Sequence, residues 1–170
     1  MKTPSDNIRV LMVCLGNICR SPTAEAMLRH KAHAAGLDGR VGVDSAGTAD
    51  YHVGSPPDRR AVAHGERRGL QMKPLRGRQV SLADFERFDF ILAMDEDNLA
   101  NLERIRPQGS RAKLELLMFY APQAGAREVP DPYYGGADSF EMVLDLVDAA
   151  CEGFLTKVVL TDLPAGRKPL

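Results

Sequence analysis

The chain has 170 residues, 44% of them hydrophobic and 26% charged, and its 22 basic and 23 acidic residues leave a net charge of −1. This composition is typical of one compact domain, expected to span 1–170 with flexible tails at 1–7 and 161–170, and it favours neither nucleic acid nor a membrane surface as a partner. There is no run of about 18 apolar residues for a membrane span, and the three cysteines lack the spacing of a disulfide framework or a zinc site. We therefore expect a cytoplasmic protein without metal or cofactor, either a monomer or a weak dimer.

Apolar runs and helical stripes alternate along the chain. In order, they predict strand 8–13, helix 22–35, strand 40–45, helix 59–68, a short helical turn from 81, strand 88–94, helix 96–105, strand 113–119 and helix 138–158. Strands that alternate with helices indicate an α/β fold, here a four-stranded parallel sheet flanked by helices on both sides in a Rossmann-like three-layer sandwich. In such sheets ligands bind beyond the carboxyl ends of the strands, and Cys14 lies at one such end.

Polar residues mark the expected helix starts. Ser21 is a suitable N-cap for the first helix, and Asp58 and Asp95 precede two further helices. Asp138, with Glu141 three residues later, forms the pattern of a capping box before the last helix.

The stretch V-C-L-G-N-I-C-R-S-P, residues 13–22, joins the first strand to the first helix. Cys14 precedes Arg20 by six residues, a spacing that is weak alone but is strengthened by the strand–turn–helix context. The first N–H groups of the helix point toward the turn and favour an anion there. Gly16 and Asn17 tolerate the backbone angles of a tight turn, and Arg20 presents a planar fork that matches two phosphate oxygens. We predict a cup for a tetrahedral anion with a cysteine sulfur at its base.

Cys14 must be a thiolate to attack phosphorus, and an ordinary free thiol is largely protonated at neutral pH. A helix N-terminus contributes at most about 2 kcal/mol toward the charge, which is less than the ionisation requires. We therefore expect Arg20, the converging N–H groups and the Ser21 hydroxyl to stabilise the thiolate together. The alternative is an unreactive buried cysteine at a strand end, which is the common case for cysteine, but the turn and the arginine count against it.

This stretch resembles, nearly letter for letter, the signature of the low-molecular-weight protein tyrosine phosphatases. D-S-A-G-T at 44–48, F-D-F-I-L-A-M-D at 88–95 and D-P-Y-Y at 131–134 are similar to further landmarks of that family. The likeness covers almost the whole chain. It implies a metal-independent hydrolase that removes phosphate from phosphotyrosine-containing proteins through a cysteinyl-phosphate.

The resemblance also implies roles for individual residues. Cys14 is the implied nucleophile, Arg20 binds phosphate and stabilises the transition state, and Asp131 is the general acid and base. The implied substrate- and phosphate-binding residues are Leu15, Gly16, Asn17, Ile18, Cys19, Ser21, Tyr51, Tyr133 and Tyr134. Ser45 is implied to hold the loop in shape.

Asp131 lies between Pro130 and Pro132, which limit where its carboxylate can point. Tyrosine leaves as a phenolate, and protonating such a group in the transition state is worth about 10²–10⁴-fold in rate. On its own D-P-Y-Y is more often a simple turn, so only its pairing with the anion cup promotes Asp131 to a catalytic role. Tyr133 and Tyr134 are expected to wall the cleft rather than merely pack the loop.

Two departures from the family pattern bear on substrate choice. Tyr51 stands where the family often has tryptophan, and the chain has no tryptophan. Arg68 is expected where many members have a histidine that bonds the loop asparagine. The four histidines show no metal-ligand spacing, and we assign them no chemistry.

Three other functions fit parts of the pattern. An arsenate reductase would need two further cysteines close together, and after Cys19 the chain has only Cys151, which is expected in the core stripe of the last helix. A protein-arginine phosphatase tends to have threonine where Ile18 stands. A phosphotyrosine-binding module would not need both Cys14 and Asp131. Cys19 itself is either a small packing residue or, as the resemblance favours, the partner of Cys14 in a redox-sensitive disulfide.

Overall fold

The computed structural model describes residues 7–160. The elements are β1 (Ile8–Cys14), α1 (Arg20–Ala34), β2 (Val41–Gly47), α2 (Arg59–Glu66), α3 (Asp84–Arg87), β3 (Phe90–Ala93), α4 (Glu96–Ile105), β4 (Lys113–Leu116) and α5 (Ala137–Phe154). Two 3-10 turns, Leu117–Tyr120 and Pro122–Ala124, follow β4, and a π-helical turn, Leu155–Val159, extends α5. Apart from Asn7, the expected tails at 1–7 and 161–170 lie outside the described residues.

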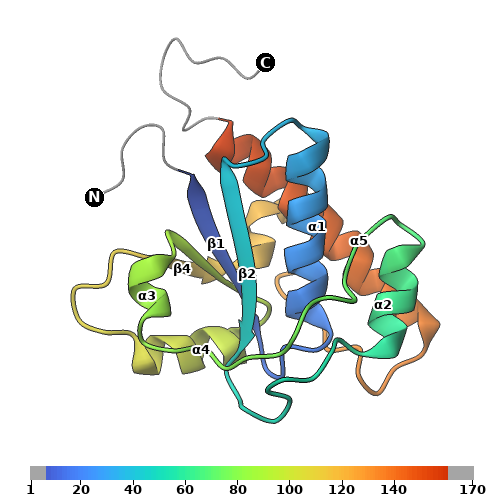
Figure 1. The fold of residues 1–170 in the computed structure, drawn as a ribbon, viewed down its shortest axis with the longest axis horizontal. Coiled ribbons are helices and arrows are strands. Elements are labelled where there is room, and N and C mark those ends of the chain that lie inside the picture. Colours follow the sequence, from blue (N-terminus) through green and yellow to red (C-terminus); the bar gives the residue numbers. More distant parts are fainter. Residues whose placement is uncertain (1–6, 161–170) are drawn as a thin grey trace.

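The four strands form one parallel sheet in the order β2-β1-β3-β4 (Figure 1). Helices α1, α2 and α5 cover one face of the sheet, and α3 and α4 cover the other. The predicted α/β fold, with a parallel sheet between two helical layers, is confirmed.

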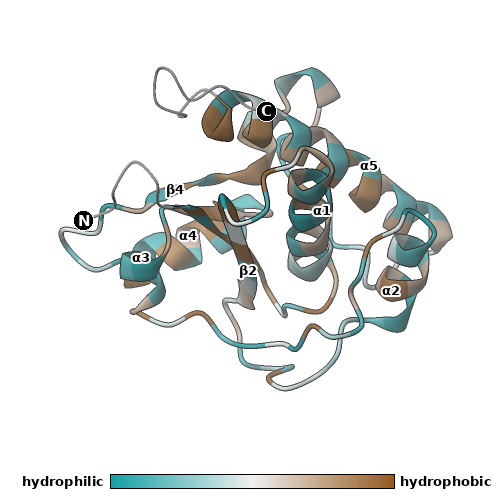
Figure 2. Cartoon of the chain, turned by 45° about the horizontal axis from the view of Figure 1, so that its top comes forward, coloured by the Kyte–Doolittle hydropathy of each residue, from teal (hydrophilic) through white to brown (hydrophobic). Residues whose placement is uncertain are grey.

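Side chains that alternate along β1 divide the core into two layers. Val10 and Met12 pack in the layer of α1 and α5, whereas Leu11 and Val13 pack in the layer of α3 and α4. Both faces of the strand are therefore buried, which is why its sequence is a continuous apolar run instead of an alternating one. Figure 2 shows this hydrophobic colouring along the strands, while the helices are mixed as expected of elements with one buried face.

The parallel register brings the carboxyl ends of β1, β2 and β3 to one edge of the sheet. Cys14 pairs with Gly47 on β2, and Val13 pairs with Ala93 on β3. A Cβ atom at Gly47 would lie 2.6 Å from the carbonyl oxygen of Leu15, so glycine is what allows the loop after β1 to pack directly on β2. This edge therefore presents the loop that follows Cys14.

Most elements begin or end one to four residues away from the expected positions, and two of these shifts have a visible cause. Helix α1 begins at Arg20, with Cys19 as its N-cap, because the Ser21 hydroxyl turns toward the Cys14 sulfur instead of capping the helix. Strand β4 ends at Leu116 rather than at 119, since the chain tightens there into a 3-10 turn.

The predicted caps have mixed outcomes. Asp58 and Asp95 cap α2 and α4 through their carboxylates, as expected. The capping box before α5 is wrong: Gly136 is the N-cap and no side chain caps the helix. Glu141 instead accepts a hydrogen bond from Arg68, because α5 packs against the end of α2.

None of the helices in residues 7–160 is long and apolar enough to cross a membrane.

Candidate active site

The anion cup, residues 14–20, joins the end of β1 to the start of α1. Cys14 is 3% exposed at its base, and the Asn17 backbone N–H donates to the Cys14 Sγ at 3.3 Å. Asn17 takes a left-handed conformation with φ of 59°, which asparagine tolerates better than most residues and which turns this N–H inward. The cup is thus built to place a backbone donor on the sulfur.

Hydroxyl hydrogens behind the cup are directed by Asn17. Its Nδ2 donates to the Oγ of Ser21 at 2.8 Å and to the Oγ of Ser45 at 3.0 Å. Because Ser21 accepts from this amide, its own hydrogen is available for the Cys14 Sγ at 3.0 Å. The backbone N–H of Arg78 bonds the Asn17 Oδ1 at 3.0 Å and fixes the amide orientation. The result is a second donor aimed at the sulfur.

The network continues to a buried carboxylate on α1. Ser45 Oγ donates to Glu25 Oε1 at 2.6 Å, and Arg29 pairs with Glu25 Oε2 at 2.6 Å. Glu25 is only 4% exposed, and its burial raises its pKa in spite of the bonds from Ser45 and Arg29. With its hydrogen directed to Glu25, Ser45 is left to accept from Asn17. Glu25 thereby anchors the far end of the network.

The buried charge of Glu25 predicts a pH effect on stability. A carboxyl whose pKa is raised by folding favours the folded state at low pH, and that contribution is lost as the pH rises through the raised value. Relative to the wild-type protein, Glu25→Gln should therefore gain in unfolding free energy as the pH rises above the ordinary titration range of a glutamate, since glutamine never ionises. The glutamine carbonyl oxygen can still accept from Ser45, so activity should change little. Urea unfolding at several pH values measures this.

The matched control for this experiment is Glu86→Gln, which neutralises an exposed glutamate on α3. Its stability should run parallel to that of the wild-type protein over the same pH range. If the plot of unfolding free energy against pH for Glu25→Gln also ran parallel to that of the wild-type protein, the charge of the buried carboxylate would not destabilise the folded state.

Arg20 is 3% exposed, and two oxygen atoms from outside the cup hold its guanidinium in place. Its Nη1 donates to Asp95 Oδ2 at 2.6 Å and to the carbonyl oxygen of Val129 at 3.1 Å. Burial opposes the guanidinium charge, but the Cys14 sulfur and the carboxylates of Asp95 and Asp131 outweigh it and raise the pKa of Arg20. The guanidinium is therefore a permanent, oriented cation beside the cup.

Asp131 reaches the same place from a loop far along the chain. Its Oδ2 lies 3.7 Å from the Arg20 Nη2, and its side chain is 48% exposed. The backbone N–H of Tyr133 donates to its Oδ1 at 3.1 Å, as in an Asx turn. A sulfur, a guanidinium and a partly exposed carboxylate thus converge at one sheet edge.

A cleft of about 330 Å³ opens above the cup. It is lined by Cys14, Leu15, Gly16, Ile18, Cys19, Arg20, Tyr51, His52, Asp131, Tyr133 and Tyr134. Among the predicted site residues, Asn17, Ser21 and Ser45 do not line it but lie buried behind it. The rings of Tyr133 and Tyr134 meet edge to face, with their centres 5.0 Å apart. Tyr51, on the wall of the cleft, is 72% exposed.

His52 also lines the cleft, although the sequence analysis assigned it no chemistry. Its ring meets that of Tyr51 edge to face at 6.5 Å, and its Cδ2 would lie 3.0 Å from a Cβ atom at Gly16. The lack of a side chain at Gly16 therefore leaves room for this imidazole at the mouth of the cup. In the sequence, its position directly after Tyr51, in the loop after β2, could have indicated that His52 lines the cleft.

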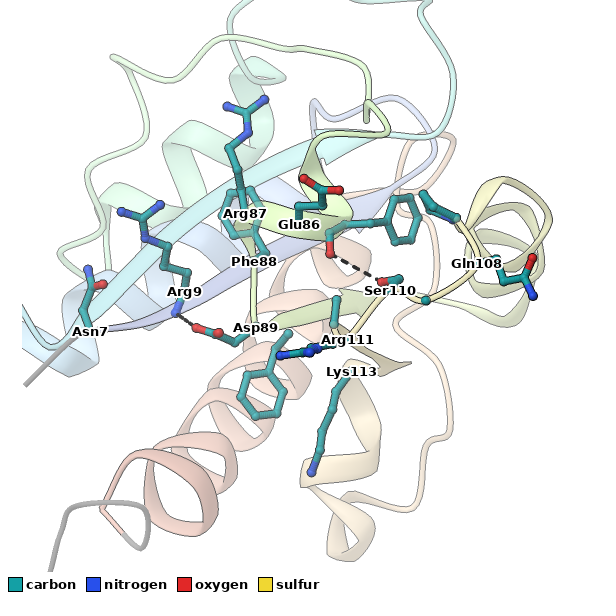
Figure 3. A pocket seen from close by; sticks show the side chains of 15 residues that line it. Asn7, Arg9, Glu86, Arg87, Phe88, Asp89, Gln108, Ser110, Arg111 and Lys113 are labelled. Carbon is teal, nitrogen blue, oxygen red and sulfur yellow. Dashed lines mark hydrogen bonds between the residues drawn. The ribbon is translucent and has the colours of Figure 1, made fainter. Parts of the chain in front are cut away.

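A larger hollow of about 1010 Å³ lies at the opposite edge of the sheet, near the starts of β1, β3 and β4 (Figure 3). Arg9, Asp89, Arg111 and Lys113 are among the side chains around it, and the Arg9 backbone N–H donates to Asp89 Oδ2 at 2.8 Å. In the described chain its lining holds no cysteine or histidine. The smaller cleft, which has the Cys14 thiol at its base beside Arg20 and Asp131, is therefore the candidate active site.

A family model described as "Low molecular weight phosphotyrosine protein phosphatase" matches residues 9–162. Over 154 residues the chain is 47% identical to the low molecular weight phosphotyrosine protein phosphatase of Schizosaccharomyces pombe, covering 89% of this chain and 97% of that protein. The chain belongs to this phosphatase family.

Solved structures of similar proteins agree with the family. A protein tyrosine phosphatase from Entamoeba histolytica, with Hepes in its active site, matches with a TM-score of 0.87 and 39% identity over 90% of this chain and 97% of that one. A Drosophila arginine phosphatase matches with a TM-score of 0.83 and 35% identity over 88% and 95%. The same fold thus occurs in proteins named for two different phosphorylated residues.

One arginine of the phosphatase lies elsewhere than expected. Arg68 does not contact Asn17; its guanidinium bonds Glu141 at 2.7 Å and Asp145 at 2.9 Å on α5. The bond to the Asn17 Oδ1 comes from the backbone of Arg78 instead. The expectation for Arg68 was wrong because α2 packs against α5, so that the Arg68 side chain reaches the carboxylates of α5 instead of the cup.

The other two cysteines of the phosphatase are buried free thiols. Burial, followed by the charges of Asp58 and Cys14, raises the pKa of Cys19 to about 12. Cys151 is fully buried on α5, as predicted, and burial raises its pKa also. Both are therefore neutral at physiological pH, which leaves Cys14 as the thiol placed among donors and a cation.

Proposed function

We propose that this phosphatase hydrolyses phosphotyrosine on protein substrates, with Cys14 as nucleophile, Arg20 as phosphate ligand and Asp131 as general acid and base. The observation that carries the proposal is the placement of the Cys14 sulfur at the base of a cleft, within reach of the Asn17 N–H and the Ser21 hydroxyl. Donors on the sulfur stabilise a thiolate, and the Arg20 guanidinium adds a positive charge next to it.

In the first step the Cys14 thiolate attacks phosphorus, so that an S–P bond forms while the bond from phosphorus to the tyrosine oxygen breaks. The leaving oxygen takes the proton of the Asp131 carboxyl group, which lines the cleft 3.7 Å from the Arg20 Nη2. Arg20 and the N–H groups of the cup hold the equatorial phosphoryl oxygens, where charge gathers in the transition state.

In the second step water attacks the phosphorus of the cysteinyl-phosphate. The Asp131 carboxylate accepts a proton from this water, the S–P bond breaks and the Cys14 thiolate returns as inorganic phosphate departs. The proton balance closes, since Asp131 starts and ends the cycle protonated. Arg20 serves both steps because it is fixed by Asp95 and Val129 rather than by the substrate.

Aromatic walls support phosphotyrosine as the substrate. Tyr51, Tyr133 and Tyr134 stand around the mouth of the cleft, where they can contact a substrate ring held above Cys14. Ile18 lines the cleft with an apolar side chain that offers no hydrogen bond to a guanidino group. These observations favour a phosphoryl ester of tyrosine over phosphoarginine.

A side-by-side assay of phosphotyrosine and phosphoarginine peptides, with arsenate reduction as a third arm, tests the proposed substrate. We expect phosphotyrosine to give the highest kcat/KM, by about 10-fold or more over phosphoarginine, because Ile18 offers no hydrogen-bond acceptor to the N–H groups of a guanidino group. A higher kcat/KM for phosphoarginine would contradict the proposal. An Ile18→Thr variant places a hydroxyl at this position and should lower the ratio of kcat/KM for phosphotyrosine to kcat/KM for phosphoarginine.

Finer features of the proposal follow from the same chemistry. Because the Cys14 thiolate attacks phosphorus directly, no metal-bound water is needed as nucleophile. We therefore propose that turnover needs no metal ion and continues in EDTA. The mechanism requires a free Cys14 thiol, so we also propose a reducing, cytoplasmic setting. We further propose that the site is redox-sensitive: peroxide oxidises Cys14 to a sulfenic acid, and the Cys19 thiol then condenses with it to a disulfide and releases water. Recovery of activity with dithiothreitol after peroxide treatment measures this.

We further propose that residues 1–170 act as one phosphatase domain, working as a monomer or weak dimer. Phosphotyrosine-containing proteins are its proposed partners, and neither nucleic acid nor a membrane surface has a proposed role. The two core layers on a single sheet, together with a family model that spans 9–162, support the single domain.

A further inference from the structure

The position of Asp131 depends on a loop with few attachments. This Asp131 loop, residues 129–136, is fixed at its start, where the Val129 N–H donates to the Met94 carbonyl oxygen at 2.8 Å and Arg20 bonds the Val129 carbonyl oxygen. From 131 to 136, the backbone–backbone hydrogen bonds of the described chain all stay local, within the loop or to the first turn of α5. Backbone hydrogen bonds therefore do not tie this part of the loop to the sheet, and its other contacts come from side chains.

Arg60, on the first turn of α2, supplies one such contact. Its Nη2 donates to the Tyr133 carbonyl oxygen at 2.9 Å, and its Nη1 lies 3.5 Å from the Gly135 carbonyl oxygen. Its guanidinium carbon also lies 5.5 Å from the Tyr133 ring centre and 4.7 Å from that of Phe140, the latter on α5. A single guanidinium thus contacts the Asp131 loop through both its backbone and an aromatic ring.

Asp58 in turn holds Arg60. The guanidinium bonds both carboxylate oxygens of Asp58, from Nε at 3.1 Å and from Nη2 at 2.9 Å, and this side-chain bonding keeps the pKa of Asp58 below its ordinary value. The backbone N–H of Asp58 donates to the carbonyl oxygen of Ile18 at 2.8 Å. Ile18 belongs to the anion cup, so the contacts run from the cup through Asp58 and Arg60 to Tyr133.

We propose that Arg60 is a positioning residue that sets the distance between Asp131 and the anion cup. Tyr133 lies two residues after Asp131, and its own N–H bonds the Asp131 carboxylate, so a shift of Tyr133 moves the acid. This inference rests on the proposed function, in which Asp131 protonates the leaving oxygen. A misplaced acid slows that proton transfer while leaving the nucleophile in place.

Leaving-group dependence tests the proposal, because a group that leaves easily needs less help from an acid. We expect Arg60→Ala to lower kcat for phosphotyrosine by about 10-fold or more, and for p-nitrophenyl phosphate by much less. Arg60→Lys should behave like the alanine variant, since an ammonium cannot bond both oxygens of Asp58 and the Tyr133 carbonyl in one plane. The matched control is Arg59→Ala, which removes the exposed neighbouring arginine and should leave both rates unchanged.

A double mutant separates this inference from the function beneath it. In an Asp131→Asn background, Arg60→Ala should add little further loss, because the group it positions is no longer an acid. Equal losses on both substrates, no loss at all, or full additivity with Asp131→Asn would overturn the role of Arg60. If Asp131→Asn itself showed no leaving-group dependence, the assignment of the acid would fail instead. Circular dichroism and melting curves confirm that each variant is folded.

Discussion

Cys14→Ser is expected to remove turnover, with kcat falling by roughly 10⁴-fold or more on any aryl phosphate. A serine hydroxyl is a far weaker acid than a thiol, so the Ser21 hydroxyl and the Asn17 N–H would have no anion to stabilise. The cup itself should survive, because the bonds of Asn17 to Ser21 and Ser45 do not involve the sulfur. Steady-state kinetics with p-nitrophenyl phosphate measures the loss.

Cys151→Ser is the matched control for this variant, as it makes the same atomic change in a buried cysteine that does not line the cleft. It should lose stability but keep kcat in the folded fraction. The Cys14→Ser variant should still bind inorganic phosphate, because Arg20 and the N–H groups of the cup remain. Calorimetry measures this binding. Full activity in Cys14→Ser would contradict the mechanism.

Asp131→Asn is expected to have the next largest effect. Asparagine keeps the shape and can still accept from the Tyr133 N–H, but it has no proton to give at the leaving oxygen. We expect kcat for phosphotyrosine to fall by about 10²–10⁴-fold, and for p-nitrophenyl phosphate by less, since nitrophenolate leaves without full protonation. The pH profile of kcat should also lose the limb that reports the acid.

Asp138→Asn makes the same charge change at an exposed position on the first turn of α5. It should leave kcat and its pH profile as in the wild-type protein. A loss for Asp131→Asn that is equal on both substrates would show that the residue supports the loop but does not donate the proton.

The fold was predictable because its signals are local and repeated. Residues 10–14 of the first strand form an uninterrupted apolar run, and the caps at Asp58 and Asp95 lie directly before their helices. The capping box at Asp138 failed because a tertiary partner, Arg68, competes for Glu141. Local capping patterns do not show such competition between distant elements.

The cup was predictable for a related reason, since one unbroken stretch holds the nucleophile, the turn and the arginine. Asp95 and Arg60 were missed as parts of the site because they meet it only after the chain has folded back on itself. Glu25 was also missed, because the burial of this charged residue in the first turns of α1 follows from tertiary packing. Its link to Ser45 depends on the packing of α1 against β2, which the order of residues does not state.

The most direct test of the mechanism is to locate the phosphate during turnover. The wild-type protein is mixed with phosphotyrosine peptide, stopped in acid within the first turnover and analysed by mass spectrometry of its peptides. We expect one added phosphoryl group on the peptide that contains Cys14, held on sulfur and absent from Cys14→Ser. A phosphoryl group on another residue, or none on Cys14 while the substrate is being hydrolysed, would contradict a pathway through the cysteinyl-phosphate.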